Sequence, residues 1–390
     1  MFDLSEIQSS LAEFGFDAWL LTDFRGNNPL AQRVLELDQR PGLSRRWYYL
    51  IPAKGEPRKL QHRIEPHALG HLPGGAATYL AWEQLEEELR KLIGGVRKVA
   101  MEYAPGLSNP YLSRIDGGTV EFLRGAGLEI ESSGNLIQLF EATWDDAQWE
   151  MHLEAEQHTT SAFDRAWKYI ADEVNKKGKA TEKEVQDQIM RHFAERGMTT
   201  YHPPIVAVGP HSGDPHYETG TTEIREGDLV LIDLWAKMDR PRSVYSDLTR
   251  MGFVGKSVPS EYAKVFGIVA AARDAAIGLV EERFRQQKSL QGWEVDRAAR
   301  GVIEEAGYGD YFVHRTGHSI GQETHGNGAN MDSLETREER LVLPRTCFSI
   351  EPGIYLKEFG IRSEINVFIT GDSEVRVTGG PVQREILALG

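Results

Sequence analysis

Two acidic side chains stand inside apolar, strand-like runs, and this feature constrains the fold more than any other. Asp228–Trp235 reads DLVLIDLW and Tyr245–Val254 reads YSDLTRMGFV, with a polar, proline-containing segment between them, which predicts an antiparallel hairpin. Asp233 lies on one strand, and Asp247 lies on the other, 14 residues later. Apolar residues flank Asp233 on both faces of its strand, so a solvated surface does not explain it. We expect the two carboxylates to enter one buried site.

The same arrangement occurs near the C-terminus. Cys347–Tyr355 reads CFSIEPGIY and Ile361–Thr370 reads IRSEINVFIT, so a second hairpin carries Glu351 on one strand and Glu364 on the other. Four carboxylates in one pocket repel one another and take up protons, whereas two divalent cations balance them. For Glu364 alone, an ion pair with Arg362 is the alternative. For the set of four, the pattern favours a metal site.

Three histidines cluster among glycines in His314–Gly326, which reads HRTGHSIGQETHG. Glycine lets a backbone pass close to a ligand, so these histidines are better candidates for a site than isolated ones. We expect His318 to complete the carboxylate set. His325 and His216 are expected to lie further out and to move protons or hold a substrate oxygen. Carboxylates with one imidazole suit Mn²⁺ best, with Co²⁺ and Zn²⁺ as alternatives.

The pattern of the chain changes about a third of the way along it. Helix and strand signals alternate at first: Asp17–Thr22 reads as a strand, and Trp82–Ile93 is an amphipathic helix stopped by two glycines. A long helical run then begins near Thr143. We predict an α/β (α+β) fold with a small domain over residues 1–142 and a larger one over residues 143–390, which carries all the candidate site residues.

Composition excludes several classes of protein. The chain has 59 acidic and 44 basic residues, and its net charge of -15 argues against nucleic acid as a main partner. The single cysteine, Cys347, excludes an intramolecular disulfide and suits a reducing compartment. We see no signal-peptide pattern and no apolar run long enough to span a bilayer. We therefore expect a cytoplasmic protein without membrane contacts.

With these motifs in view, the chain resembles the pita-bread metallopeptidases, which include methionine aminopeptidase, aminopeptidase P and prolidase. It is most similar to the proline-specific branch, in which a creatinase-like N-terminal domain precedes the catalytic pita-bread domain. The resemblance implies two divalent metal ions, a small peptide substrate and a homodimer. The family's ligands run Asp, Asp, His, Glu, Glu, and they fall here on Asp233, Asp247, His318, Glu351 and Glu364.

The resemblance also implies a reaction, the hydrolysis of Xaa-Pro bonds by an Xaa-Pro dipeptidase or an aminopeptidase P. A hydroxide bridging two metals attacks the scissile carbonyl, and Glu351 shuttles the proton to the leaving nitrogen. One metal and His325 stabilise the oxyanion. His216 and His314 position the substrate. Arg362 supports the site or binds a substrate carboxylate.

Three features depart from the family's pattern. The spacing between Asp233 and Asp247 is longer than is common, which predicts an extended hairpin loop. His325 is followed by Gly326, where an acid is usual. The segment Asn327–Arg340, NGANMDSLETREER, is unusual and is expected to reshape the rim of the site. These departures concern the substrate more than the chemistry.

Three other readings compete with a proline-specific peptidase. A metal-free, creatinase-like amidinohydrolase and a non-catalytic pita-bread binding module both lack the complete ligand set, which is intact here. A methionine aminopeptidase does not account for the additional N-terminal domain or the long spacing between the two Asp ligands.

Overall fold

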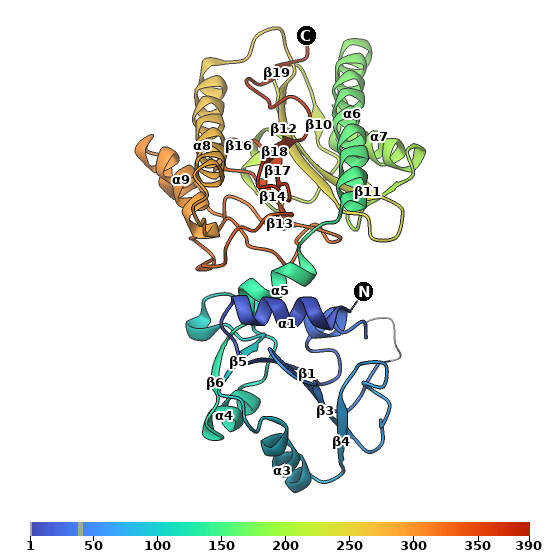
Figure 1. Cartoon of the computed structure of the whole chain (residues 1–390). Coiled ribbons are helices and arrows are strands. Elements are labelled where there is room, and N and C mark those ends of the chain that lie inside the picture. Colours follow the sequence, from blue (N-terminus) through green and yellow to red (C-terminus); the bar gives the residue numbers. More distant parts are fainter. Residues whose placement is uncertain (1, 38–41) are drawn as a thin grey trace. The chain divides into compact units, whose positions relative to one another are not determined.

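The computed structural model describes residues 2–37 and 42–390. The chain forms two compact units, Met1–Glu141 and Ala142–Gly390. Both contain helices and strands, so the fold is mixed α/β, as the sequence predicts (Figure 1). Among the described residues, no helix combines the length and the apolar character needed to cross a membrane.

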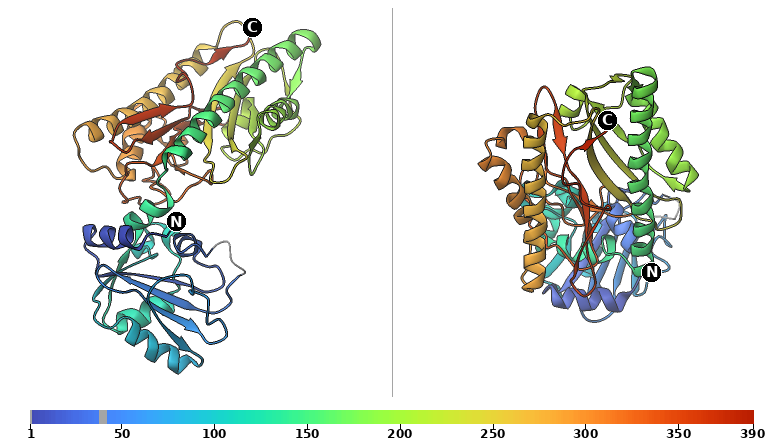
Figure 2. Two further views of the ribbon diagram at one scale, coloured as in Figure 1. Left: turned by 45° about the vertical axis from the view of Figure 1, so that its right-hand side comes forward. Right: turned by 90° about the horizontal axis from the view of Figure 1, so that it is seen from above.

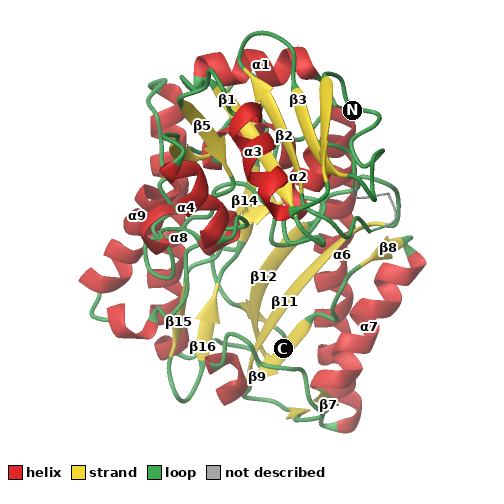
Figure 3. Ribbon diagram, turned by 90° about the horizontal axis from the view of Figure 1, so that it is seen from below, coloured by secondary structure: helices red, strands yellow, loops and turns green. Residues whose placement is uncertain are grey.

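The first unit is built on a six-stranded sheet with the order β4-β3-β2-β1-β5-β6. Figure 3 labels its strands β1, β2, β3 and β5. In chain order its main elements are α1 (Leu4–Glu13), β1 (Ala18–Asp23), α2 (Pro29–Val34), β2 (Trp47–Pro52), β3 (Arg58–His62), β4 (Gly75–Tyr79), α3 (Trp82–Leu92), β5 (Lys98–Met101), α4 (Gly117–Gly125), β6 (Glu129–Ser132) and α5 (Gly134–Glu141). Residues of β1 alternate between two buried clusters. Trp19 belongs to the cluster that contains Ile7 of α1, and Leu20 to the one that contains Leu89 of α3. Helices therefore cover both faces of this sheet.

The second unit combines four long helices with several short sheets. Its elements are α6 (Asp146–Lys177), β7 (Ala180–Thr181), α7 (Glu182–Glu195), β8 (Met198–Thr199), β9 (Ile205–Val208), β10 (Glu223–Ile224), β11 (Leu229–Met238), β12 (Ser246–Phe253), α8 (Ser260–Arg285), α9 (Gly292–Glu305), β13 (Ser319–Ile320), β14 (Cys347–Ile350), β15 (Gly353–Tyr355), β16 (Gly360–Arg362), β17 (Ile365–Ile369), β18 (Val375–Thr378) and β19 (Leu387–Ala388). The Asp145 carboxylate caps α6 in a capping box with Gln148. Figure 2 shows α6 and α8 on opposite sides of the strands.

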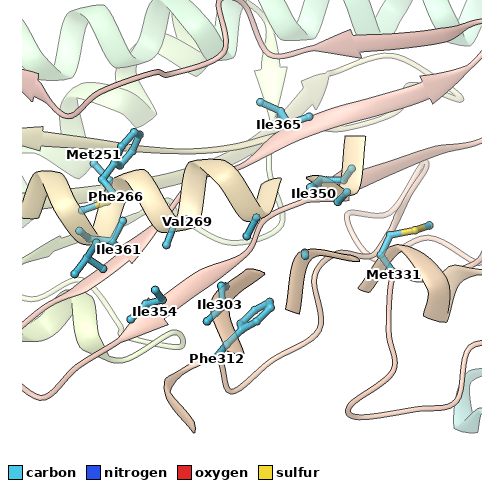
Figure 4. Close-up of a cluster of buried hydrophobic side chains, with 14 of the residues drawn as sticks. Met251, Phe266, Val269, Ile303, Phe312, Met331, Ile350, Ile354, Ile361 and Ile365 are labelled. Carbon is cyan, nitrogen blue, oxygen red and sulfur yellow. The ribbon is translucent and has the colours of Figure 1, made fainter. Parts of the chain in front are cut away.

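The two sides of β11 face two different cores. Val230 and Ile232 belong to the cluster built with α6, whereas Leu229 and Leu231 belong to the cluster built with α8. Figure 4 shows this second cluster, which includes Phe266 of α8 and Ile361 of β16. Because side chains alternate along a strand, the side chain of Asp233 lies on the same face of β11 as those of Leu229 and Leu231. The packing on both sides explains why Leu229–Ala236 of this strand is apolar apart from this acid.

Both predicted hairpins form, but the second one is interrupted. β11 and β12 pair antiparallel without a break from Leu229↔Phe253 to Ala236↔Ser246. In the second hairpin, β14 pairs with β17 up to Ile350↔Ile365, and a separate pair, β15 with β16, starts at Gly353↔Arg362. The residues between these two ladders include Glu351 and Glu364.

Candidate metal centre

The β11–β12 hairpin presents Asp233 and Asp247 on one face. Asp247 is directly opposite Trp235, and Thr249 is directly opposite Asp233. Alternate residues of a strand and direct cross-strand partners share a face, so both carboxylates point to the same side. Both residues are buried.

Glu364 and Glu351 enter from the break in the second hairpin. Glu364 is attached to the first hairpin twice, because Thr249 Oγ1 donates to Glu364 Oε2 (2.8 Å) and Glu364 N donates to the Thr249 carbonyl (3.2 Å). The Glu351 carboxylate accepts a hydrogen bond from Ser349 Oγ at Oε1 (3.0 Å). Leaving the regular ladder at this point lets both side chains turn toward the aspartates.

His318 lies between the carboxylates. Its Nε2 is 3.5 Å from Asp247 Oδ2 and 3.4 Å from Glu351 Oε1. Its Nδ1 is 3.1 Å from the Ser319 carbonyl, an acceptor that requires the proton on Nδ1. That hydrogen bond leaves the Nε2 lone pair free to bind a cation among the carboxylates.

The cluster fits a divalent cation by its geometry and its donor set. Ligand atoms of Asp247, His318 and Glu364 lie within 4.8 Å of one another. Asp233 Oδ1 is buried and has no hydrogen-bond partner among the described residues. A buried carboxylate oxygen without compensation is costly, and a bound cation removes that cost. Oxygen donors with one imidazole are typical of Mn²⁺, Co²⁺ and Zn²⁺ sites.

The carboxylates differ in how strongly the surroundings disfavour their charge. Burial raises the pKa of Asp233 to about 7, and the charges of Asp247 and Glu351 add to this effect. Burial, followed by the neighbouring carboxylates, also raises the pKa of Asp247 and, well above its usual range, that of Glu364. Glu351 is the exception: burial opposes ionisation, but the charge of His318 contributes to holding its pKa below the usual value. Such a set binds protons unless metal replaces them.

A chain of hydrogen bonds leads from His314 to Asp233. His314 Nε2 accepts from Tyr355 Oη (2.6 Å), and its Nδ1 donates to the Arg315 carbonyl (2.7 Å). Arg362 Nη1 donates to the same Tyr355 oxygen (3.1 Å), and Nη2 donates to Asp233 Oδ2 (2.5 Å). Burial lowers the pKa of His314 to about 4, consistent with a neutral ring. The ion pair of Arg362 is therefore with Asp233, where the sequence offered Glu364 as its partner.

His325 and His216 lie at the exposed side of the cluster. The ring of His325 meets that of His318 edge to face, with centroids 4.4 Å apart. The charge of His318, and then burial, lower the pKa of His325 to about 3, and His216 is close enough to contribute to that shift. His216 is exposed, and its backbone N–H donates to Asp214 Oδ1 (3.0 Å). A neutral His325 is thus available next to the cluster.

Comparison with known proteins bears on this site directly. The family model described as metallopeptidase family M24 matches residues 150–371. The chain belongs to this family. It is 29% identical over 310 residues to the putative dipeptidase YkvY of Bacillus subtilis, covering 78% of this chain and 77% of that protein. It is 34% identical over 184 residues to the Xaa-Pro dipeptidase of Pyrococcus furiosus, about half of either chain (47% and 48%).

Solved structures show the same fold for this M24 chain. The dipeptidase PepE of Mycobacterium ulcerans aligns with a TM-score of 0.70 at 22% identity, over 99% of this chain and 96% of that one. The Xaa-Pro dipeptidase of Bacillus anthracis aligns with a TM-score of 0.62 at 22% identity, over 99% and 98%. The fold is therefore that of the pita-bread peptidases, and M24 enzymes depend on metal.

The segment Asn327–Arg340 of this M24 chain is folded around a buried ion pair. Arg340 Nη2 is 2.6 Å from Glu338 Oε2, and both side chains are almost fully buried. Arg340 also donates to the carbonyls of Asn327 (2.8 Å) and Gly328 (2.7 Å). Arg340 thereby holds the start of the segment, which begins two residues after His325, in a defined conformation.

Three residues that the sequence did not single out support this candidate site. Thr249 joins Glu364 to the first hairpin, Tyr355 joins His314 to Arg362, and Ser349 contacts both the backbone of His318 (2.9 Å) and the carboxylate of Glu351. For Thr249 there was a signal in the sequence, because it shares a strand face with Asp247. Tyr355 contacts His314 and Ser349 contacts His318, 41 and 31 positions away in the chain, and no local sequence pattern predicts such contacts.

Proposed function

We propose that the chain is a dinuclear-metal-dependent exopeptidase that hydrolyses Xaa-Pro bonds. The observation that carries the proposal is the cluster of acids around His318, in which one oxygen of Asp233 is buried without a partner among the described residues. The residues that would hold the two ions, with Mn²⁺ as first choice, are Asp233, Asp247, His318, Glu351 and Glu364. The proline preference is supported by the Xaa-Pro dipeptidases among the relatives and structural neighbours.

The side chains around the cluster have distinct parts in the proposed reaction. Bound divalent ions would supply the activation of a water molecule and the polarisation of the scissile carbonyl. Glu351 takes up a proton from the attacking water molecule and delivers it to the leaving nitrogen, since its lowered pKa keeps it ionised and Ser349 orients it. His325 donates an N–H to the oxygen of the attacked carbonyl. His216 lies further out and positions the peptide.

His314 and Arg362 bear on the site through Tyr355 and Asp233. Their nitrogens are occupied by hydrogen bonds to those two residues, to the Arg315 carbonyl and, for Arg362 Nε, to Thr249 Oγ1 (3.1 Å). We propose that Arg362 supports Asp233, the first of the two roles expected for it. We propose that His314, which lies at the end of this chain of hydrogen bonds, positions the substrate.

Two further points of the proposal concern the context of the enzyme. We propose a cytoplasmic homodimer. Two of the three competing readings, a metal-free amidinohydrolase and a non-catalytic binding module, predict that no metal copurifies at a constant ratio.

The test is hydrolysis by chelator-treated protein, with and without added Mn²⁺, of Xaa-Pro dipeptides beside longer Xaa-Pro peptides. Metal-dependent cleavage of either class supports the proposal, and the preferred length decides between prolidase and aminopeptidase P activity. If metal is bound but neither class of peptide is cleaved, the proposed preference for Xaa-Pro bonds is rejected. Absence of metal and of cleavage would reject the peptidase in favour of the metal-free amidinohydrolase or the binding module.

A further inference from the structure

Helix α9 carries a buried ion pair that the proposed reaction does not use. Asp296 and Arg300 are one helical turn apart, and Arg300 Nε is 3.1 Å from Asp296 Oδ2. The side chain of Asp296 is 0% exposed and that of Arg300 is 6% exposed. A buried ion pair adds little net stability, because the loss of hydration offsets the attraction between the charges. The other contacts of the two side chains indicate what the pair does.

The Asp296 carboxylate accepts hydrogen bonds from two segments outside α9. Oδ1 accepts from Thr316 N (2.9 Å) and from Thr316 Oγ1 (2.6 Å). Oδ2 accepts from Ser333 N (3.0 Å) and from Ser333 Oγ (2.5 Å). Both oxygens also accept from the guanidinium of Arg300. One carboxylate thus joins Thr316 to the segment Asn327–Arg340, which contains Ser333.

Arg300 holds the chain just before Thr316. Its Nη1 donates to the Phe312 carbonyl (2.8 Å), and its Nη2 donates to the His314 carbonyl (2.8 Å). The guanidinium also lies over the Phe312 ring, 4.1 Å from the centroid. The ion pair therefore contacts alternate residues of the segment that leads to His318.

Thr316 is the residue through which this ion pair reaches the metal centre. It is fully buried, and Asp296 accepts from both its backbone N–H and its hydroxyl. Its carbonyl accepts a hydrogen bond from Glu351 N (2.7 Å), and the His318 carbonyl accepts one from Ser349 N (2.9 Å). Two candidate ligands, His318 and Glu351, thus lie on paired backbone segments, and Thr316 belongs to that pairing.

Ligands bind a metal ion more tightly when outer contacts hold them in place, and losing such a contact commonly costs about 10–100-fold in affinity. We infer that Asp296 is a positioning residue of the metal centre, which together with Arg300 fixes the place of Thr316. Through Thr316 it sets the backbone positions of His318 and Glu351. This inference rests on the proposed function, because it concerns the metal that the peptidase would use.

The experiment measures the affinity of the full-length protein for Mn²⁺ by competition with a chelating dye. In Asp296→Asn the amide nitrogen would face N–H donors whichever way the amide is turned, so we expect the affinity to fall by about 10–100-fold. Glu304→Gln is the matched control on the same helix, because Glu304 pairs with Arg297 with its side chain 43% exposed. The affinity of this control should stay within about twofold of wild type.

A second pair of variants applies if Asp296→Asn does not fold. Thr316→Val keeps the shape of the side chain and removes the hydroxyl that donates to Asp296, so we expect a loss of affinity of about tenfold. Thr316→Ser keeps the hydroxyl and loses only a methyl group, so its affinity should stay within about twofold of wild type. Both substitutions should lower Tm, whereas only the first should lower the affinity of the folded protein for Mn²⁺.

The outcomes separate the inference from the proposed function. A folded Asp296→Asn or Thr316→Val variant with wild-type affinity for Mn²⁺ would overturn the inference. Equal losses of affinity in Thr316→Val and Thr316→Ser would also overturn it, because they would result from lost packing and not from the lost hydroxyl. If the wild-type protein binds Mn²⁺ but cleaves no Xaa-Pro peptide, the proposed function fails, and the affinities alone decide the inference. A wild-type protein without affinity for Mn²⁺ would reject both.

Discussion

Arg362 and Asp233 form a buried ion pair in which one carboxylate oxygen is held by the guanidinium and the other is left without a partner among the described residues. Oδ2 accepts from Nη2 at 2.5 Å, and Oδ1 remains for a cation. The arginine lowers the pKa of Asp233 against the effect of burial, and so favours the ionised form that a metal needs.

Arg362→Met should therefore weaken metal binding, although Arg362 is not itself a candidate ligand. Loss of a group that orients a ligand commonly costs about 10–100-fold in metal affinity. A competition titration of Mn²⁺ against a chelating dye measures the change. Arg384→Met is the matched control, because Arg384 forms an ion pair with Asp274 with its side chain 69% exposed. Equal affinities in the two variants would show that Arg362 does not support Asp233.

Asp247→Asn should abolish both metal binding and turnover, since an amide oxygen carries no charge to balance a divalent ion. The backbone contacts of Asp247 with Asn366 are unaffected by the change, so the fold should persist. Metal content by elemental analysis, together with the peptidase assay, checks this. Full activity of the variant at normal metal content would contradict the assignment of Asp247 as a ligand.

The sequence predicted the first hairpin well and the second one only in part. An acid in an apolar strand was enough to predict that Asp233 is buried, which the structure shows. Cys347–Tyr355 was expected to be one strand, but the structure breaks it after Ile350. Pro352 has no N–H to donate, so the ladder cannot continue through it.

The same break explains the partner of Arg362. On a continuous strand, Arg362 and Glu364 would share a face, which is why an ion pair between them was an alternative. β16 ends at Arg362 and β17 begins at Ile365, so the rule of alternation does not hold across Glu364. Arg362 instead reaches Asp233, 129 positions away in the chain, a contact that no local pattern contains.

The stabilisation that metal provides should increase with pH. In the metal-free fold the pKa of Asp233 is raised to about 7, and those of Asp247 and Glu364 are raised as well, so these carboxyls retain protons that the unfolded chain has lost. Their contribution to the stability of the metal-free protein is present at low pH and is lost as pH rises toward 7. Metal binding must displace the same protons.

We expect the rise in Tm on adding Mn²⁺ to be small near about pH 5.5 and larger near about pH 8. The comparison is made between metal-loaded and chelator-treated samples at each pH. Buried groups outside the set of candidate ligands, such as His152, whose pKa burial lowers to about 4, affect both samples equally, so their contributions cancel in the comparison. A shift in Tm that is independent of pH would contradict protonated carboxyls in the metal-free site.

Gly317→Ala should destabilise the protein strongly, because the residue before His318 has no room for a side chain. A Cβ there would stand 1.9 Å from the Ser349 carbonyl, and that carbonyl belongs to backbone that β14 holds in its ladder. Gly301→Ala is the matched control: it lies within α9, where a Cβ meets nothing within 4 Å. In urea unfolding, the free energy of unfolding should increase by about 0.5–1 kcal/mol for Gly301→Ala. It should decrease by about 1–3 kcal/mol for Gly317→Ala.

Since the backbone of His318 must move to relieve the clash, Gly317→Ala should also lose metal affinity, whereas Gly301→Ala should not. Equal stability of the two variants would mean that His318 is not held against Ser349 as the structure shows.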